Sequence, residues 1–142
     1  MTKYLLDTNV VSELRKHNPH GGVIDWIQSL RDDQIYLSAV TMGELQAGIE
    51  RTRKPNPAKA REIETWVDQV ENSFHVLPMD SLCFREWARL MEGRPEHLLE
   101  DVMIAATARV HALTLASRNE RDFARLHVGI INPFKQTRSF AG

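Results

Sequence analysis

Five short apolar runs, separated by longer segments with a helical repeat, constrain the fold of this 142-residue chain more than any other feature. The predicted strands are residues 3–6, 35–39, 75–79, 113–116 and 129–131. Several of them are nearly continuous in apolar character, which is typical of strands covered on both faces. Strands that alternate with helices in this way predict an α/β fold, in which helices cover both faces of a mostly parallel sheet.

Two of the intervening segments carry clear helix signals. Apolar residues recur at helical spacing from Ile63 to Val70, behind a Pro-Asn-Pro break, and predict one amphipathic helix. A second helix is expected behind Asp80, a candidate N-cap, and should stop at Gly93 and Pro95. These signals predict one helix before and one helix after the third predicted strand in the sequence.

The chain is expected to form one domain over residues 1–142, since this length is enough for a sizeable core. Segment 51–57 holds two prolines and three basic residues, and is interpreted as an exposed connection within a helical hairpin rather than a domain boundary. Residues 135–142 are expected to be a loosely held tail.

Composition limits the classes of function. The chain has 18 basic and 19 acidic residues, so no global field draws it to nucleic acid or to a membrane. A polyanionic substrate would need local basic groups, for which the candidates are Arg51, Arg53, Lys54, Arg118 and Arg121. The lone Cys83 excludes a disulfide framework and is expected in the core. Neither a signal peptide nor an apolar stretch of about 20 residues is found, and a cytoplasmic protein without a membrane partner is expected.

Four acidic residues stand where a metal-dependent hydrolase would place them: Asp7, Glu44, Asp101 and Asp122. Asp7 directly follows the first predicted strand and Asp122 closely follows the fourth, so both are expected at the carboxyl edge of the sheet. Asp101 shares a helical stripe with small alanines and should point toward the core or a cleft. A shared divalent metal would satisfy all four carboxylates, and ligands that are all oxygen favour Mg²⁺ or Mn²⁺ over zinc.

Each of these residues also has a purely structural interpretation. Asp7 could be only a helix N-cap, and Glu44 could be one more solvated helix glutamate. Asp101 could be a residue near a helix N-terminus that the helix dipole stabilises. Asp122 could cap or close a short helix, with Asn119 as a competing N-cap. The six histidines have no metal-ligand spacing and are expected at the surface or in the core.

Taken together, these residues resemble the PIN domain, and within it the VapC-like toxins of prokaryotic toxin–antitoxin modules. The resemblance is carried by residues 5–9, 41–45, 101 with 104–108, 117–123 and 129–134. It implies a three-layer α/β/α sandwich with a central, mostly parallel sheet, at whose carboxyl edge the acidic residues converge.

The resemblance also implies an activity and partners. It implies a Mg²⁺- or Mn²⁺-dependent endoribonuclease, often acting on structured RNA such as transfer RNA, and a homodimer held inactive by a cognate antitoxin. The implied catalytic and metal-binding residues are Asp7, Glu44, Asp101 and Asp122, supported by the polar Thr8, Asn9, Ser117 and Asn119. Ser117 stands where many members carry threonine, and it keeps the hydroxyl. Either Asp122 or Asn119 could make the fourth contact.

The sequence also bears on other functions. A phosphohydrolase of the haloacid-dehalogenase type would need a second acid two residues after Asp7, and Asn9 cannot donate the proton that such an acid supplies. A non-toxin PIN-type nuclease for RNA processing and a catalytically inactive binding module stay as alternatives. Cleavage that needs Mg²⁺ and is lost on substituting Asp101 would separate an enzyme from a binding module.

Overall fold

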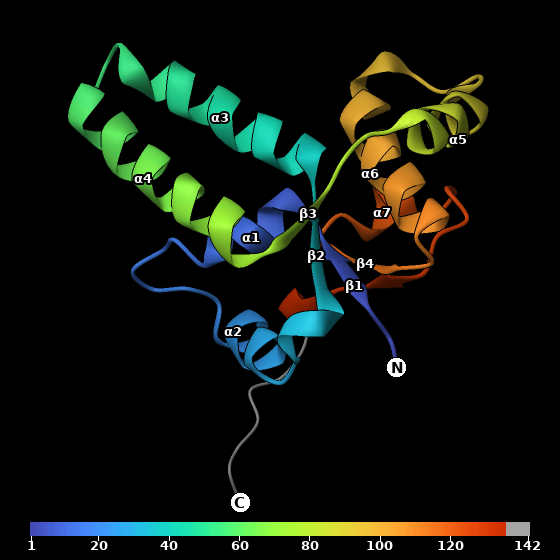
Figure 1. Ribbon diagram of the computed structural model, residues 1–142, viewed down its shortest axis with the longest axis horizontal. Coiled ribbons are helices and arrows are strands. Elements are labelled where there is room, and N and C mark those ends of the chain that lie inside the picture. Colours follow the sequence, from blue (N-terminus) through green and yellow to red (C-terminus); the bar gives the residue numbers. More distant parts are fainter. Residues whose placement is uncertain (136–142) are drawn as a thin grey trace, which may run out of the picture.

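The computed structural model describes residues 1–135, and its centre is a parallel sheet. The strands are β1 (Tyr4–Leu6), β2 (Ile35–Ser38), β3 (His75–Leu77), β4 (Thr114–Ala116) and β5 (Ile130–Ile131). They lie in the order β3-β2-β1-β4-β5, and every described pair is parallel (Figure 1). All five predicted strands are confirmed. The chain adds strands first on one side of β1 and then on the other, so the strand order reverses between β1 and β4.

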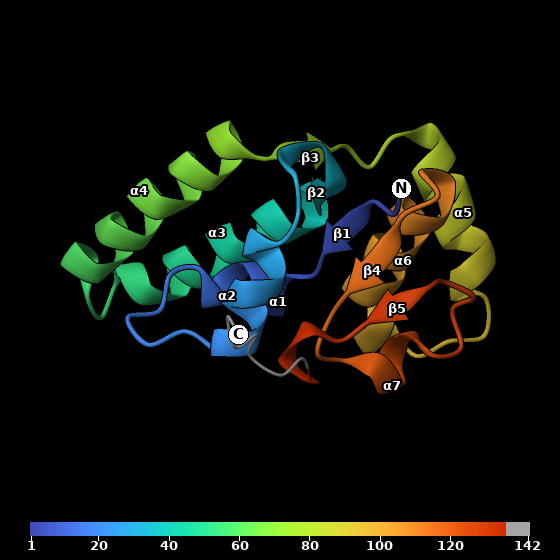
Figure 2. The same ribbon diagram turned by 90° about the horizontal axis from the view of Figure 1, so that it is seen from below.

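Helices cover both faces of this sheet. They are α1 (Thr8–Glu13), α2 (Gly21–Gln28), α3 (Ala39–Arg53), α4 (Pro57–Ser73), α5 (Ser81–Met91), α6 (Leu99–Val110) and α7 (Glu120–Phe123). Three single 3₁₀ turns, η1 (Asp32–Gln34), η2 (Glu96–Leu98) and η3 (Pro133–Lys135), complete the described elements. The α3–α4 hairpin lies on one side of the strands, and α5 and α6 lie on the other (Figures 1 and 2). The predicted α/β/α sandwich is confirmed.

The three central strands, β1, β2 and β4, bury both of their faces. Successive side chains of a strand point to opposite sides, and Leu5 accordingly packs with Ile104 of α6, whereas Leu6 packs with Val10 of α1. Leu115 of β4 belongs to the same cluster as Leu5, and the next residue along the strand belongs to the cluster of Leu6. Two apolar layers explain why the strands read as continuous apolar runs rather than alternating ones.

Local signals fix most helix ends. The Asp80 side chain accepts a hydrogen bond from the Cys83 backbone at 3.0 Å, which confirms the predicted N-cap of α5. Gly93 follows α5 with a φ of +75°, a left-handed conformation that favours glycine. The predicted break at 51–57 is confirmed as a hairpin connection but is too wide, because α3 continues through Arg53 and α4 begins at Pro57. The connection is residues 54–56, where Pro55 has no backbone N–H to continue the hydrogen bonds of α3.

The remaining predictions about the whole chain have mixed outcomes. Cys83 is buried in the structure, as expected. The predicted loose tail lies outside the described residues apart from Lys135, which belongs to η3 and pairs with Glu120 at 2.7 Å. Among residues 1–135, none of the helices combines the length and apolar character needed to span a bilayer.

Candidate active site

Asp7 lies at the carboxyl end of the central strand, and α1 begins at the next residue. Its Oδ1 accepts a hydrogen bond of 2.8 Å from the Thr8 backbone N–H, so Asp7 is indeed the N-cap of α1. The second oxygen, Oδ2, accepts hydrogen bonds from Ser117 at 2.7 Å and from Asn9 at 3.3 Å. The capping and site interpretations are therefore compatible, because each carboxylate oxygen has its own partners.

Ser117 connects two strand ends across the point where strand order reverses. It follows β4, is fully buried, and donates its hydroxyl to Asp7 while accepting the Asn119 backbone N–H at 2.9 Å. The side-chain oxygen Oδ1 of Asn9 also accepts a hydrogen bond from the Arg118 backbone N–H at 3.2 Å. The predicted polar residues thus form one network around Asp7, and this network holds the loop after β4 against the start of α1.

Glu44 reaches the same edge from α3, a helix that Ser38 caps by accepting the Val40 backbone N–H. The Thr8 hydroxyl donates to Glu44 Oε1 at 2.9 Å, and it lies 3.1 Å from the hydroxyl oxygen of buried Thr41. Thr8 therefore contacts Asp7 through its backbone and Glu44 through its side chain. Glu44 is a half-buried site residue rather than a solvated helix glutamate.

Asp101 stands in the first turn of α6, which begins at Leu99, so it does lie near a helix N-terminus. It nevertheless faces a polar hollow of about 280 Å³. That hollow is lined by Asp7, Thr8, Asn9, Ser12, Glu44, Asp101 and Asn119. Three of the four predicted acidic residues therefore open onto one space: Asp7 from the end of β1, Glu44 from α3 and Asp101 from α6.

Asp122 is placed differently from the other three acids. It is an exposed residue of α7 and does not line the hollow, whereas Asn119 does. The Asp122 charge still lies near enough to raise the pKa of Asp7 and of Asp101. The structure thus puts Asn119 at the hollow and Asp122 at its margin.

Burial and the charges of neighbouring carboxylates raise the pKa values of Asp7, Glu44 and Asp101. Burial, followed by the charges of Asp7, Asp122 and Glu44, raises the pKa of Asp101 to about 7. Burial raises the pKa of Asp7 more than its hydrogen bond from Ser117 lowers it. Burial and the Asp7 charge also raise the pKa of Glu44. Each carboxylate is therefore ionised at a cost that a nearby cation would reduce.

The chemistry of this donor set suits a hard cation. Carboxylate, hydroxyl and amide oxygens are the ligands that Mg²⁺ and Mn²⁺ prefer. Within residues 1–135, however, no group of three or more His, Cys, Asp or Glu side chains has an arrangement that would hold a metal ion. The chemical type of these donors suits Mg²⁺ or Mn²⁺. To bind them together, an ion would have to draw the mutually repelling carboxylates closer to one another.

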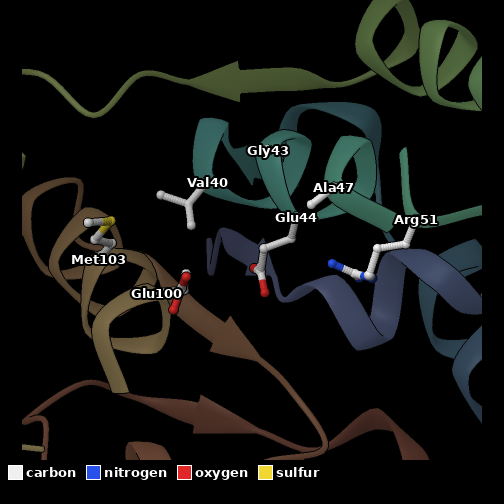
Figure 3. A pocket seen from close by; sticks show the side chains of 7 residues that line it. All are labelled: Val40, Gly43, Glu44, Ala47, Arg51, Glu100 and Met103. Atoms are coloured by element: carbon white, nitrogen blue, oxygen red, sulfur yellow. The ribbon is translucent and has the colours of Figure 1, made fainter. Parts of the chain in front are cut away.

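Sequence reasoning missed three residues around this site. Ser12 lines the hollow one helical turn after Thr8, and that spacing was a usable signal. Thr41 contacts Thr8, which no local pattern predicts. Glu100 contributes to the raised pKa values of Glu44 and Asp101. Figure 3 shows Glu100 and Glu44 on opposite walls of a neighbouring hollow between α3 and α6.

The sequence is similar to a known family and to individual proteins of known sequence. A family model described as the PIN domain matches residues 4–128. The toxin FitB of Neisseria gonorrhoeae is 33% identical over 137 residues, which cover 92% of this chain and 97% of that protein. The VapC ribonuclease Y4jK of Sinorhizobium fredii is 33% identical over 142 aligned residues, which cover 92% of this chain and 97% of that one.

Solved structures extend the comparison. The crystal structure of FitAcB from Neisseria gonorrhoeae superposes with a TM-score of 0.81 at 32% identity, covering 93% of this chain and 99% of that one. A member of the VapBC family of toxin–antitoxin systems, VapBC-5 from Mycobacterium tuberculosis, superposes with a TM-score of 0.64 at 25% identity. The latter match covers 93% of this chain and 99% of the other.

Proposed function

This chain belongs to the PIN-domain family, and we propose that it is a metal-dependent endoribonuclease and the toxin of a toxin–antitoxin pair. One observation carries the proposal: Asp7, Glu44 and Asp101, from three separate elements, line a single hollow at the carboxyl edge of the sheet. The names of its relatives, a toxin and a VapC ribonuclease, support this chemistry over the alternative of an inactive binding module.

The acidic residues would hold Mg²⁺ or Mn²⁺, with Asp7, Glu44 and Asp101 at the hollow and Asp122 at its margin. A bound ion would neutralise phosphate charge and activate a water molecule for attack on the phosphodiester. The surrounding residues of the chain orient these donors. Ser117 and Asn9 fix Oδ2 of Asp7, and the Thr8 hydroxyl fixes Oε1 of Glu44.

We infer two protein partners. VapBC-5 comes from a toxin–antitoxin system, which supports a cognate antitoxin for this chain as well. A homodimer is proposed from the family resemblance, and α5 supplies an apolar surface for it, since Leu82 is 62% exposed and Phe84 is 45% exposed. Light scattering of the purified chain, alone and with the antitoxin encoded beside it, tests both partners.

The proposed substrate is structured RNA such as transfer RNA, and the proposed place of action is the cytoplasm. The test is to incubate antitoxin-free protein with total cellular RNA, in Mg²⁺ and in EDTA. We expect discrete fragments in Mg²⁺, none in EDTA, and suppression by the antitoxin. RNA that stays intact with folded protein and Mg²⁺ contradicts the proposal, and cleavage in EDTA contradicts its metal dependence.

A second assay separates the toxin from a non-toxin RNA-processing nuclease. Expression of the chain without its antitoxin should arrest growth, and co-expression of the antitoxin should restore it. A chain that cleaves RNA in vitro but leaves growth unchanged when expressed alone would be a processing enzyme rather than a toxin.

A further inference from the structure

A groove between α1 and α3 carries two arginines that have no place in the cleavage site described above. It has a volume of about 530 Å³, and both Arg15 and Arg51 line it. Thr8, Ser12 and Glu44 line this groove and also the polar hollow that holds Asp101. The groove is therefore continuous with the site and leads away from the acidic residues.

On each wall of the groove, an arginine follows a residue of the site by seven positions in the sequence. Thr8 and Arg15 lie about two helical turns apart along α1 and the turn that follows it, and Glu44 and Arg51 are equally spaced along α3. At a rise of 1.5 Å per residue, the backbone of each arginine lies about 10 Å along its wall from the backbone of Thr8 or Glu44. A single strand of RNA could pass along both ends at once.

Within the described residues, no acidic side chain forms an ion pair with Arg15 or Arg51. Figure 3 shows Arg51 extending along α3 toward Glu44. Nη2 of Arg51 lies beside Gly48, 3.7 Å from the place that a Cβ would occupy there, which is an ordinary van der Waals distance. Arg53, by contrast, is held by two glutamates.

We propose that Arg15 and Arg51 bind a backbone phosphate of the RNA next to the cleaved bond, a role that rests on the ribonuclease function proposed above. The chain has a net charge of −1 and so no overall attraction for RNA. The acidic hollow itself repels phosphate. Two free guanidinium groups beside it supply the missing local charge, and their planar donors match phosphate oxygens. They are positioning residues. Because they contact the phosphate backbone of the RNA, their binding does not depend on the base sequence.

The test measures binding of bulk transfer RNA in Mg²⁺ at several salt concentrations. The parent is the Asp101→Asn variant, which should not cleave, and it is compared with the same protein carrying Arg15→Ala and Arg51→Ala. The matched control carries Arg61→Ala and Arg85→Ala, which remove the same charge from exposed positions of α4 and α5. Thermal melting verifies that each variant is folded.

We expect the Arg15→Ala, Arg51→Ala pair to raise the dissociation constant about tenfold. The slope of log affinity against log salt should fall by roughly 0.7 for each phosphate contact that is lost. The control pair should change the dissociation constant and the salt slope much less than the Arg15→Ala, Arg51→Ala pair does. Replacing both arginines with lysine should restore the salt slope but not the full affinity. In the active protein, the alanine pair should raise KM and leave kcat nearly unchanged.

The outcomes separate this inference from the function on which it rests. If wild-type protein cleaves RNA and the parent binds it, but the alanine pair behaves like the control pair, the phosphate role alone is wrong. If the alanine pair weakens binding of the antitoxin and not of RNA, the groove is a protein interface. If wild-type protein neither binds nor cleaves RNA, both the function and the inference are wrong.

Discussion

The hydroxyl of Ser117 donates a 2.7 Å hydrogen bond to Oδ2 of Asp7, across a separation of 110 residues in the sequence. This bond joins the end of β4 to the end of β1, the two strands between which the strand order reverses. It fixes the direction of a carboxylate that is only 4% exposed. The arrangement makes Ser117 a support for Asp7 rather than a reacting group.

Replacing Ser117 with alanine should therefore weaken metal binding while the fold is kept. Loss of a partner that orients a ligand typically costs about 10–100-fold in metal affinity or activity. Cleavage rates measured over a range of Mg²⁺ concentrations would report the loss as a higher Mg²⁺ requirement. The Ser117→Thr variant keeps the hydroxyl and is the control. Equal losses in both variants would point to packing at this buried position instead of the hydrogen bond.

Mg²⁺ should raise the melting temperature of the protein. Burial and then the charges of neighbouring carboxylates raise the pKa values of Asp7, Glu44 and Asp101, so a bound cation relieves repulsion in the folded state alone. A ligand at 100 times its dissociation constant stabilises the folded state by about 2.7 kcal/mol. Differential scanning fluorimetry with Mg²⁺ and with EDTA measures the shift, which should shrink in Asp101→Asn. An unchanged melting temperature at saturating Mg²⁺ would count against metal binding.

Stability without metal should fall as the pH rises toward and through neutrality. The pKa of Asp101 is raised from 3.8 to about 7 on folding, mainly by burial and then by the neighbouring carboxylates. Between these values the folded protein holds a proton that the unfolded chain has lost. The contribution of this group is thus fully present below 3.8 and is lost as the pH rises through about 7.

Urea unfolding in EDTA at about pH 5 and about pH 8 measures this dependence. The wild-type protein should lose more stability between the two conditions than Asp101→Asn, whose side chain does not ionise. The variant should also be the more stable of the two at the higher pH. Parallel pH dependences for the two proteins would mean that Asp101 is not the group responsible.

Much of this fold could be predicted from the sequence, because buried parallel strands produce continuous apolar runs and helices carry their own stop signals. The position of Asp7 followed from the same logic, since a residue directly after a central strand must lie at the sheet edge. The end of α3 was harder to predict from the sequence. Basic residues before Pro55 are good helix formers, and composition alone did not distinguish the last helical turn from the connection.

The finer structure of the site was beyond sequence reasoning for a different reason. The Thr8–Glu44 contact depends on how α3 packs against α1, and no local pattern encodes that packing. The choice between Asn119 and Asp122 depends on side-chain directions in α7, a helix of 4 residues with too little periodicity to define a buried face. Contacts between segments that are distant in the sequence determine both the Thr8–Glu44 contact and the placement of Asn119 and Asp122.

The most direct test of the proposed metal-dependent ribonuclease is the rate of RNA cleavage by Asp101→Asn in Mg²⁺. Asp68→Asn, which removes an exposed carboxylate from α4, is the matched control. We predict that Asp101→Asn is folded by circular dichroism and has no detectable cleavage, whereas Asp68→Asn cleaves at the wild-type rate. A folded Asp101→Asn protein that retains full activity would contradict the assignment of this site.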